Sequence, residues 1–592
     1  MKKDIKEVYM IKLLKNMRAK EKITALICLI FVVAQVYFDL RLPDFMTELT
    51  VLIKTSGTVN EILVVGLKML GCTLASAALA IACGFFAAKT ASGFSFVVRE
   101  KLFRHVTEMG SEEMNAFSVP SLITRTTNDI TQIQMIISMG LQMLIKAPIM
   151  AVWAIIKILG KSWELSAVTA AFVVVLFVAI LLIMITCIPR FRLVQKMTDK
   201  INRVARENLT GINVVHAFNA EEYQNEKFDS PSKEMMNLQM KNQKLFALVQ
   251  PTMSLGMNGL ALAIYWVGAA LINNIAGDVA ARLTLFSEVL VFSTYATYIV
   301  MSFMMLVMIF MMLPQAQVSA ERINEVLDRK ATVKEGSVTD GKESGTVEFK
   351  NVTFRYPNAS ADELKNIDFK IGKGETLAII GATGSGKTTL INLIPRFYDA
   401  TEGEVLIDGV NVKDYSFEAL YDKLGFVTQK AVLFSDTVKD NVLFGESLKG
   451  FTDEDFKVAE DISQAKEFVD KFPEKEEHEI AQLGRNVSGG QKQRLSIARA
   501  IARKPEILVF DDSFSALDYR TDAKLREELN EKLKDTTKII VAQRISTIRH
   551  ANKILVLENG EIVGNGTHEE LMQTCGIYRE IALSQLGAAE LA

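Results

Sequence analysis

This chain has little net charge, few cysteines and few features of a signal peptide. Its 592 residues include 67 basic and 69 acidic ones, so the net charge of −2 gives no indication of nucleic acid binding, and we expect no nucleic-acid partner. Of its five cysteines, Cys28, Cys72, Cys83 and Cys187 lie in apolar runs without the spacing of metal ligands. We therefore expect buried, reduced thiols.

We do not expect the N-terminus to be a removable signal peptide. No A-x-A-like cleavage site follows the first apolar run, although residues 1–22 are basic and roughly amphipathic. This pattern indicates a helix lying at a membrane interface and leading into a first membrane span.

Length and composition divide the chain. A chain of 592 residues exceeds the roughly 250–300 at which single cores stop growing. Long apolar runs occupy residues 23–313, whereas the part beyond Gly345 has the composition of a soluble α/β protein. We expect a membrane domain over residues 1–328, a polar linker over 329–345, and an α/β domain over 346–592.

Six segments have the length and apolarity of membrane spans, which need about 20 mostly apolar residues. They are Ile23–Phe38 and a little beyond, Ile62–Ala88, Ile133–Leu159, Leu165–Ile188, Leu245–Ile272 and Val289–Leu313. The fourth and sixth contain no charged residue. A large water-soluble helical bundle would instead show polar stripes, which these runs lack.

The loops indicate the orientation of these spans. Residues 89–132 and 189–244 are long and rich in arginine and lysine, whereas residues 160–164 and 273–284 are short and carry only Lys161 and Arg282. By the positive-inside rule, the long segments and both termini face the cytoplasm, in a multi-pass protein of the cell membrane.

Two features inside the spans have two interpretations each. Lys146 lies within the third span, so it is either a functional group or a structural lysine, whose amine reaches the cytoplasmic headgroups or which lies where the span extends beyond the bilayer. Methionines at 301, 304, 305, 308, 311 and 312 share one helical face. They form either a deformable substrate surface or ordinary packing against lipid or helices.

The second half contains a phosphate-binding pattern. The run ETLAIIGATGSGKTTLINLI predicts a buried strand, a glycine-rich turn and a helix, with Gly381, Gly386, Lys387 and Thr388 in G-x-x-x-x-G-K-T spacing. Glycines let backbone N–H groups approach phosphate oxygens, the lysine reaches the outer phosphates, and the threonine hydroxyl can bind Mg²⁺. The nucleotide site is expected to comprise Gly381, Thr383, Gly384, Ser385, Gly386, Lys387, Thr388 and Thr389.

A second glycine turn precedes a pair of acids. Ser488, Gly489, Gly490 and Gln491 stand at the start of an expected helix, which is another anion site, and ILVFDD follows as a buried strand ending in Asp511 and Asp512. A simple helix cap would account for Ser488 but not for the nearby acid pair.

Together these motifs resemble the ATP-binding cassette family. The chain resembles an exporter half-transporter, with six spans followed by one cassette domain; the motifs are Tyr356, GATGSGKT, Gln429 in FVTQK, VSGGQ, ILVFDD, SALD and VAQR. The segments ITRTTNDI and GINVVHAFNAEEY resemble the cytoplasmic regions that couple spans to cassettes. The resemblance implies ATP and Mg²⁺ as cofactors.

The resemblance also implies roles for matching residues. Tyr356 would stack on adenine, while Lys387, Thr388, Gln429 and Asp511 would hold phosphates and Mg²⁺, the metal being bound by the last three. Two cassettes face each other head to tail in this family, so Ser488, Gly489, Gly490 and Gln491 would contact the ATP of the other subunit. Asp518 would lie in the loop that meets the partner domain.

Two positions depart strongly from the family pattern. The expected general base is a glutamate, yet this chain has Asp512, which is one methylene shorter. The switch histidine is replaced by Gln543, which can donate a hydrogen bond but does not titrate near neutrality. A weaker departure, AQLGRN before VSGGQ, has no firm consequence.

These departures favour an unequal pair of ATP sites. The leading hypothesis is an exporter of amphipathic or hydrophobic compounds, drug-like or lipid-like, that acts in the lipid membrane as a heterodimer. The partner would be a homologous half-transporter carrying the glutamate and histidine, and this chain's own site would hydrolyse weakly. The alternatives are a slow homodimeric exporter and a non-transporting, nucleotide-regulated membrane protein.

Overall fold

The computed structural model describes residues 9–54, 57–159, 162–274, 279–357 and 359–585, and these divide into two compact units. The helical unit comprises the residues up to His105 and Pro120–Asp328, and the α/β unit comprises Val106–Val119 and the residues from Arg329 onward. Residues 106–119, which the sequence placed within the membrane domain, group with the α/β unit. A carboxylate oxygen of Glu113 accepts the N–H of Thr332 at 2.8 Å, and Asn115 donates to the Tyr398 hydroxyl at 2.9 Å.

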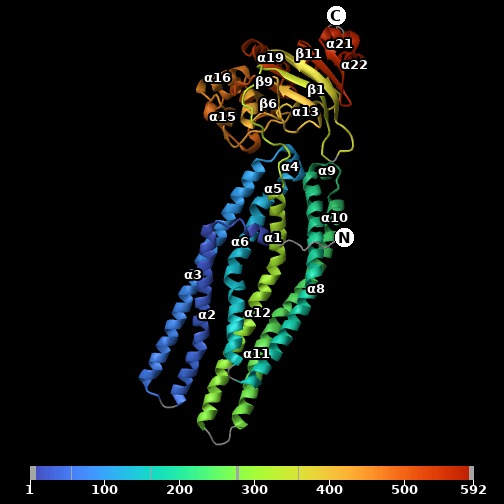
Figure 1. Ribbon diagram of the computed structural model, residues 1–592. Helices are drawn as coiled ribbons and strands as arrows, with labels where there is room; N and C mark the ends of the chain where they lie inside the picture. The colour runs from blue at the N-terminus through green and yellow to red at the C-terminus, as the bar shows by residue number, and fades with distance from the viewer. Residues whose placement is uncertain (1–8, 55–56, 160–161, 275–278, 358, 586–592) are drawn as a thin grey trace. The chain divides into compact units, whose positions relative to one another are not determined.

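Where the structure describes it, the helical unit consists of helices and two π-helical turns (Figure 1). In chain order they are α1 (Tyr9–Leu14), α2 (Ala19–Lys54), α3 (Val59–Thr107), α5 (Val119–Thr124), η1 (Arg125–Asp129), α6 (Ile130–Met139), η2 (Gly140–Leu144), α7 (Lys146–Leu159), α8 (Trp163–Thr210), α9 (Ile212–Ala217), α10 (Glu221–Ala247), α11 (Val249–Asn274) and α12 (Val279–Leu327).

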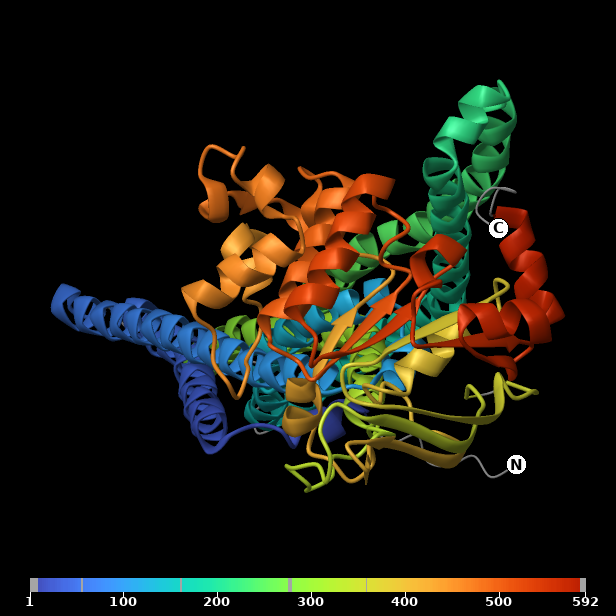
Figure 2. The ribbon, with the colours of Figure 1, turned by 90° about the horizontal axis from the view of Figure 1, so that it is seen from above.

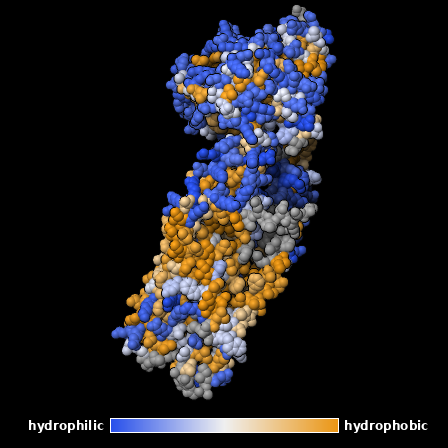
Figure 3. Space-filling model, in the orientation of Figure 1, coloured by the Kyte–Doolittle hydropathy of each residue, from blue (hydrophilic) through white to orange (hydrophobic). Residues whose placement is uncertain are grey.

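The described residues contain six helical segments long and apolar enough to cross a membrane, which confirms the expected number. They cover residues 19–53, 59–107, 119–159, 163–183, 221–274 and 281–327. Most extend well beyond the apolar runs read from the sequence, because polar helical turns continue them at one end. In the view of Figure 3, apolar residues dominate the surface over the middle of this unit.

The core of the helical unit lies between α2, α7, α8, α11 and α12. Phe292 and Tyr295 of α12 are fully buried there. Close approach of α11 depends on two glycines: a side chain at Gly256 would collide with Leu176, and one at Gly268 with Val289. Small residues at such contacts are typical of helix packing within membranes.

The α2–α3 pair lies on one side of the unit in both Figure 1 and Figure 2. Only 6% of the apolar window of α3 is buried, compared with 31% for α12. Leu63, Leu67 and Leu74 of α3 are more than half exposed. An apolar surface of this size suits contact with lipid or another chain rather than with water.

The structure shows a charged partner for Lys146. Its ammonium lies 3.0 Å from the Asp39 carboxylate of α2, and both side chains are mostly buried. Lys146 therefore pairs with a charge inside the bundle instead of extending to headgroups. Pairing is the favourable alternative because an isolated charge in apolar surroundings is costly.

Other expectations for the first half have mixed outcomes. Cys28 and Cys83 are buried, but Cys72 is only partly so, and the side chain of Cys187 lies outside the described residues. The methionine face divides, since Met304 and Met305 pack against the core whereas Met301 and Met308 are exposed. Residues 1–8 of the expected interfacial helix are outside the described part; the remainder includes α1, whose Leu13 is fully buried.

The described residues of the α/β unit form three sheets. The strands are β1 (Val347–Phe354), β2 (Leu364–Ile371), β3 (Thr376–Gly381), β4 (Glu402–Ile407), β5 (Val410–Asn411), β6 (Leu424–Val427), β7 (Asp436–Thr437), β8 (Glu479–Ile480), β9 (Ile507–Asp511), β10 (Thr537–Val541), β11 (Lys553–Glu558) and β12 (Glu561–Gly566). The sheet orders are β2-β1-β4-β5, β12-β11-β3-β10-β9-β6 and β7-β8.

Helices connect these strands. They are α4 (Ser111–Ala116), α13 (Lys387–Asn392), α14 (Phe417–Lys423), α15 (Val438–Val442), α16 (Asp453–Ile462), α17 (Lys466–Val469), the 3₁₀ turns η3 (Lys475–Glu477) and η4 (Gln482–Gly484), α18 (Gly489–Ala502), α19 (Tyr519–Lys532), α20 (Ile545–Ile548), α21 (His568–Thr574) and α22 (Gly576–Gln585).

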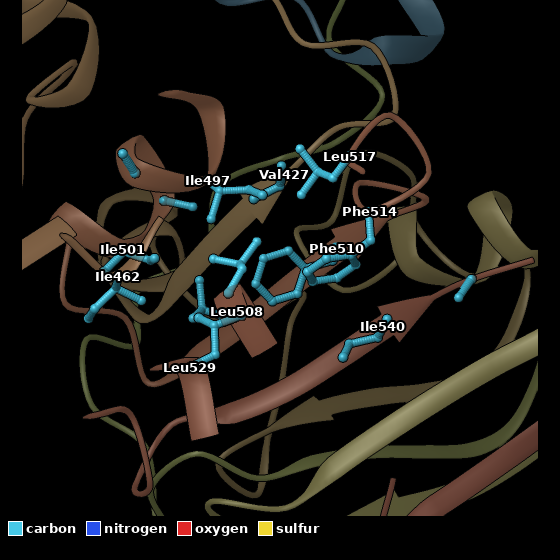
Figure 4. Close-up of a cluster of buried hydrophobic side chains, with 14 of the residues drawn as sticks. Val427, Ile462, Ile497, Ile501, Leu508, Phe510, Phe514, Leu517, Leu529 and Ile540 are labelled. Carbon is cyan, nitrogen blue, oxygen red and sulfur yellow. The ribbon is translucent and has the colours of Figure 1, made fainter. Parts of the chain in front are cut away.

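The six-stranded sheet separates two apolar cores. Alternate residues of β9 face opposite sides: Leu508 and Phe510 join one core, while Ile507 and Val509 join the other. Figure 4 shows the first core, which contains Phe510 and Ile540 together with Ile497 of α18 and Leu529 of α19. Burial on both faces explains why β3 and β9 contain the apolar runs LAII and ILVF.

A buried ionic group joins the two larger sheets. The Lys423 ammonium lies 2.7 Å from Asp408, which is fully buried, and 3.0 Å from Glu506. Asp408 also accepts the N–H of Thr346 at 2.9 Å, next to the start of β1. The strand ends of both sheets are thereby fixed around one cation.

Replacing Lys423 by methionine should therefore lower the free energy of unfolding by about 3–5 kcal/mol, because the Asp408 carboxylate remains buried without its cation. Chemical denaturation followed by circular dichroism measures the loss. The control is Lys365→Met, which breaks a half-exposed pair with Glu561 and should cost less than about 1 kcal/mol. Equal losses in the two variants would contradict this role.

Candidate nucleotide-binding site

The site lies at one edge of the six-stranded sheet, where parallel strands end. Strands β11, β3, β10, β9 and β6 pair in parallel, with Val541 opposite Asp511 and Ile379 opposite Val541. The loops that follow β3, β9, β10 and β6 begin at this edge. In parallel α/β sheets, ligands bind outside the carboxyl ends of the strands.

The loop after β3 has the backbone of a phosphate cradle. Gly384 and Gly386 have φ values of +82° and +95°, in the left-handed region that favours glycine. A side chain at Gly386 would also come within 2.8 Å of Leu364. Gly386 precedes α13, so the loop leads directly into a helix N-terminus next to the lysine.

Lys387 folds back over this loop. Its ammonium donates to the carbonyl oxygens of Gly381 at 2.8 Å and Ala382 at 2.6 Å, and lies 3.4 Å from the Ser385 hydroxyl. Burial lowers the pKa of Lys387, and the charges of Asp512 and Asp511 oppose this effect. The ammonium thus lies within the loop, close to where phosphate oxygens would bind.

Thr388 and Asp511 form the candidate metal site. The Thr388 hydroxyl donates to an oxygen of Asp511 at 3.1 Å, and Asp511 is almost fully buried at the end of β9. Burial raises the pKa of Asp511; the neighbouring Asp512 charge adds to the rise, whereas the Thr388 hydrogen bond and Lys387 oppose it. Hydroxyl, carboxylate and amide oxygens from Thr388, Asp511 and Gln429 fit Mg²⁺, a hard cation that prefers oxygen ligands.

Asp512 is held by the two glutamines that the sequence identified. One carboxylate oxygen accepts hydrogen bonds from the side-chain amides of Gln543 at 2.9 Å and Gln429 at 3.4 Å. The residue has φ +46°, a region that aspartate tolerates better than most residues with a side chain. Three separate loops therefore converge on one carboxylate.

These residues line a cleft of about 250 Å³. Its walls include Thr383, Gly384, Gly386, Lys387, Thr388, Thr389, Gln429, Asp511, Asp512 and Gln543, all expected from the sequence. Gly381 and Ser385 support the loop without lining the cleft. Glu363 and Val541 also line it and were missed: Glu363 lies in no recognisable motif, and Val541 begins the VAQR motif, in which only Gln543 was given a role.

Tyr356 approaches the cleft from the first strand. Its hydroxyl lies 3.0 Å from that of Thr389, and its ring contacts Phe354 and Tyr398. It is therefore beside the phosphate loop, but it is not among the residues that line the cleft. Its expected stacking on adenine stays a prediction.

Comparisons with known proteins agree with this geometry. Residues 25–303 match the model of the ABC transporter transmembrane region, and residues 364–515 match that of the ABC transporter. An uncharacterized ABC transporter ATP-binding protein of Mycobacterium tuberculosis is 38% identical, over 92% of this chain and 93% of its own length. The chain belongs to the ABC transporter family.

Other relatives of this ABC transporter extend the comparison. An ATP-dependent lipid A-core flippase of Pseudomonas aeruginosa is 31% identical, over 84% of this chain and 81% of the flippase. A solved structure of a bacterial Atm1-family ABC exporter with ATP bound matches with a TM-score of 0.78 and 23% identity, covering 95% of this chain and 99% of that one. The fold is therefore that of an ABC exporter, and the six helices are those of a multi-pass membrane protein.

The second glycine turn of the transporter lies apart from the cleft. Ser488 and Gln491 form a capping box at the start of α18: Ser488 accepts the Gln491 N–H at 3.3 Å, and the Gln491 side chain accepts the Ser488 N–H at 2.8 Å. None of residues 488–491 lines the cleft among the described residues. Asp518 is likewise exposed and caps α19 by accepting the N–H of Thr521 at 3.0 Å.

The Thr388→Val substitution tests the metal site. It keeps the side-chain shape but removes the hydroxyl, so affinity for ATP with Mg²⁺ should fall about tenfold, which corresponds to about 1.4 kcal/mol, while affinity for ATP without Mg²⁺ should change little. Titration calorimetry with and without Mg²⁺ measures both. Thr383→Val makes the same change elsewhere on the loop and should not produce this difference; a matching loss there would count against Thr388 as a ligand.

Proposed function

We propose that this chain is one half of a heterodimeric ABC exporter, which uses ATP to move amphipathic or hydrophobic compounds out of the cell, and that its own ATP site hydrolyses slowly. The observation that carries the proposal is the state of Asp512. The residue in the position of the general base is one methylene short, and two amides already engage one of its oxygens.

A general base must come within about 2.6–3.2 Å of the proton that it removes. Shortening the side chain withdraws the carboxylate from an attacking water, and a displacement of about 1 Å can reduce the rate about a hundredfold. Gln543 holds Asp512 through a neutral amide, which cannot exchange a proton as histidine does near neutral pH.

The binding parts support retention of nucleotide. Lys387, Thr388 and Asp511 have their family identities, and they lie together around the cleft. ATP with Mg²⁺ would then bind here and stabilise a closed pair of cassettes. In that arrangement Ser488, Gly489 and Gly490 would complete the site of the partner, where turnover would occur.

The proposed substrate class and the orientation in the membrane rest on further observations. The relatives named as lipid A-core flippases act on a lipid, which supports an amphipathic substrate. Exposed methionines on α12 supply a deformable apolar surface. The α/β unit would lie in the cytoplasm of the cell, where ATP is available, and the plasma membrane would hold the six helices.

The chain purified alone should have low ATPase activity even when ATP binds. A self-associated pair would contain two sites that both have Asp512 and Gln543, so both should be slow, about a hundredfold below a site with the glutamate base. Steady-state phosphate release in nanodiscs measures this. Turnover typical of an intact ABC exporter would contradict the proposal, as would copurification from native membranes with only a second copy of this chain.

Restoring the family residues should restore hydrolysis. The double substitution Asp512→Glu with Gln543→His should raise ATP turnover of the chain alone by about a hundredfold, because the carboxylate regains its reach. Each single substitution should raise ATP turnover by a smaller factor. Adding Lys387→Ala to the double variant is the control and should abolish the gain; an unchanged rate in the double variant, with ATP still bound, would refute the hypothesis of an impaired site.

A further inference from the structure

Two ion pairs join the same two helices of the helical unit. Asp39 of α2 lies 3.0 Å from Lys146 of α7, and Asp44 of α2 lies 2.7 Å from Lys157 of α7. Lys157 is close to the end of α7 at Leu159, and α2 ends at Lys54. We call the end of the unit marked by Lys54 and Leu159 its loop end, and both pairs lie toward it along α2.

Two further helices contact these acids. The Tyr295 hydroxyl of α12 lies 2.6 Å from Asp44 and 3.1 Å from the carbonyl oxygen of Leu40, and Tyr295 is fully buried. The Ser76 hydroxyl of α3 donates to Asp39. Each acid therefore has a cation and a hydroxyl as partners, and the stretch 39–44 of α2 contacts α3, α7 and α12.

The surroundings of the Asp39–Lys146 pair are apolar, and the Asp44–Lys157 pair is more exposed. Val36, Leu40, Met150 and Ala154, which lie on the same helices, are almost fully buried in the core of the unit. In such surroundings a partly separated pair would leave two unpaired charges, which is expensive until water enters to solvate them. The contact therefore favours two discrete states, closed and dry or open and wet.

The backbone beside the ion pairs contains features at which helices bend. Pro43 lies inside α2 between the two acids, where it removes one helical N–H. The π-helical turn η2, Gly140–Leu144, ends two residues before Lys146. Kinks in helices occur at such positions, so the two partners stand next to points where their helices can change direction.

The α2–α3 pair joins the rest of the unit mainly through α2, since the apolar window of α3 is hardly buried. We propose that the Asp39–Lys146 and Asp44–Lys157 pairs form a latch that keeps α2 closed against α7 and α12 at the loop end, and that this latch must release for the unit to open there. The inference rests on the proposed export function only in that an exporter must open on its outer side.

The test measures access of water-soluble reagent to the core behind the latch. Ala154, fully buried on α7, is replaced by cysteine in the full chain in nanodiscs, and its reaction with a charged thiol reagent is timed by mass spectrometry, with the parent chain giving the background of native cysteines. Asp39→Asn and Lys146→Met should each speed labelling of this cysteine by about tenfold or more, because the remaining charge favours the open, hydrated state.

The labelling rate should depend on whether an ion pair is kept and not on the shape of the side chains. The exchanged pair, Asp39→Lys with Lys146→Asp, and the conservative variants Asp39→Glu and Lys146→Arg should all label within about threefold of the Ala154→Cys parent, because each keeps an ion pair. The matched control is Glu48→Gln with Lys68→Met, which breaks a half-exposed pair between α2 and α3 and should leave labelling unchanged.

The substitution Ala320→Cys, at a buried position of α12 outside the latch, distinguishes opening of the latch from a general loosening of the helical unit. Labelling at this second position should not change when Asp39→Asn is added. The latch proposal is overturned if the cysteine at position 154 reacts as slowly in the Asp39→Asn and Lys146→Met variants as in the parent. It is also overturned if this cysteine reacts as fast in the charge-keeping variants as in those two, or if labelling at position 320 accelerates equally. Labelling is independent of which ATP site turns over, so failure here is distinct from failure of the hydrolysis experiments.

Discussion

The parallel pairing of β3, β10, β9 and β6 is the constraint on which the α/β unit depends. Because these strands run in the same direction, the phosphate loop, the acid pair, Gln543 and Gln429 all emerge at one edge of the sheet. These residues are far apart in sequence, yet no special contact is needed to gather them. The two apolar cores on either side of the sheet maintain this pairing, because each strand is buried on both faces.

The chemistry at this edge follows from how tightly each group is held. Asp511 is buried and hydrogen-bonded by Thr388, which suits a fixed metal ligand. Asp512 is more open, at a positive φ, and it meets two neutral amides. Aspartate is better tolerated than glutamate at positive φ, so the local backbone accommodates the substitution even though the shorter side chain loses reach. Aspartate at position 512 thus suits the backbone conformation but reaches less far than the glutamate expected as general base.

The helical unit obeys a different constraint. Its surface is apolar over the middle of the helices, so burial of apolar area alone gives little preference for one helix arrangement over another. Specific contacts decide it instead: glycines of α11 that admit Leu176 and Val289, and acids of α2 that meet Lys146, Lys157 and Tyr295. These polar contacts have few alternatives in lipid, so each has more influence on conformation than a surface pair would.

The sequence by itself determined the two-part organisation, the six spans and most of the nucleotide site, because span length, the G-x-x-x-x-G-K-T spacing and the acid pair are local patterns. Tertiary structure alone decided that Asp512 bonds Gln543 and Gln429, that Glu363 joins the cleft, and that residues 106–119 belong with the α/β unit. It also decided the partner of Lys146. These outcomes depend on which distant segments meet, and ion pairs between helices have no spacing rule that a single sequence could reveal.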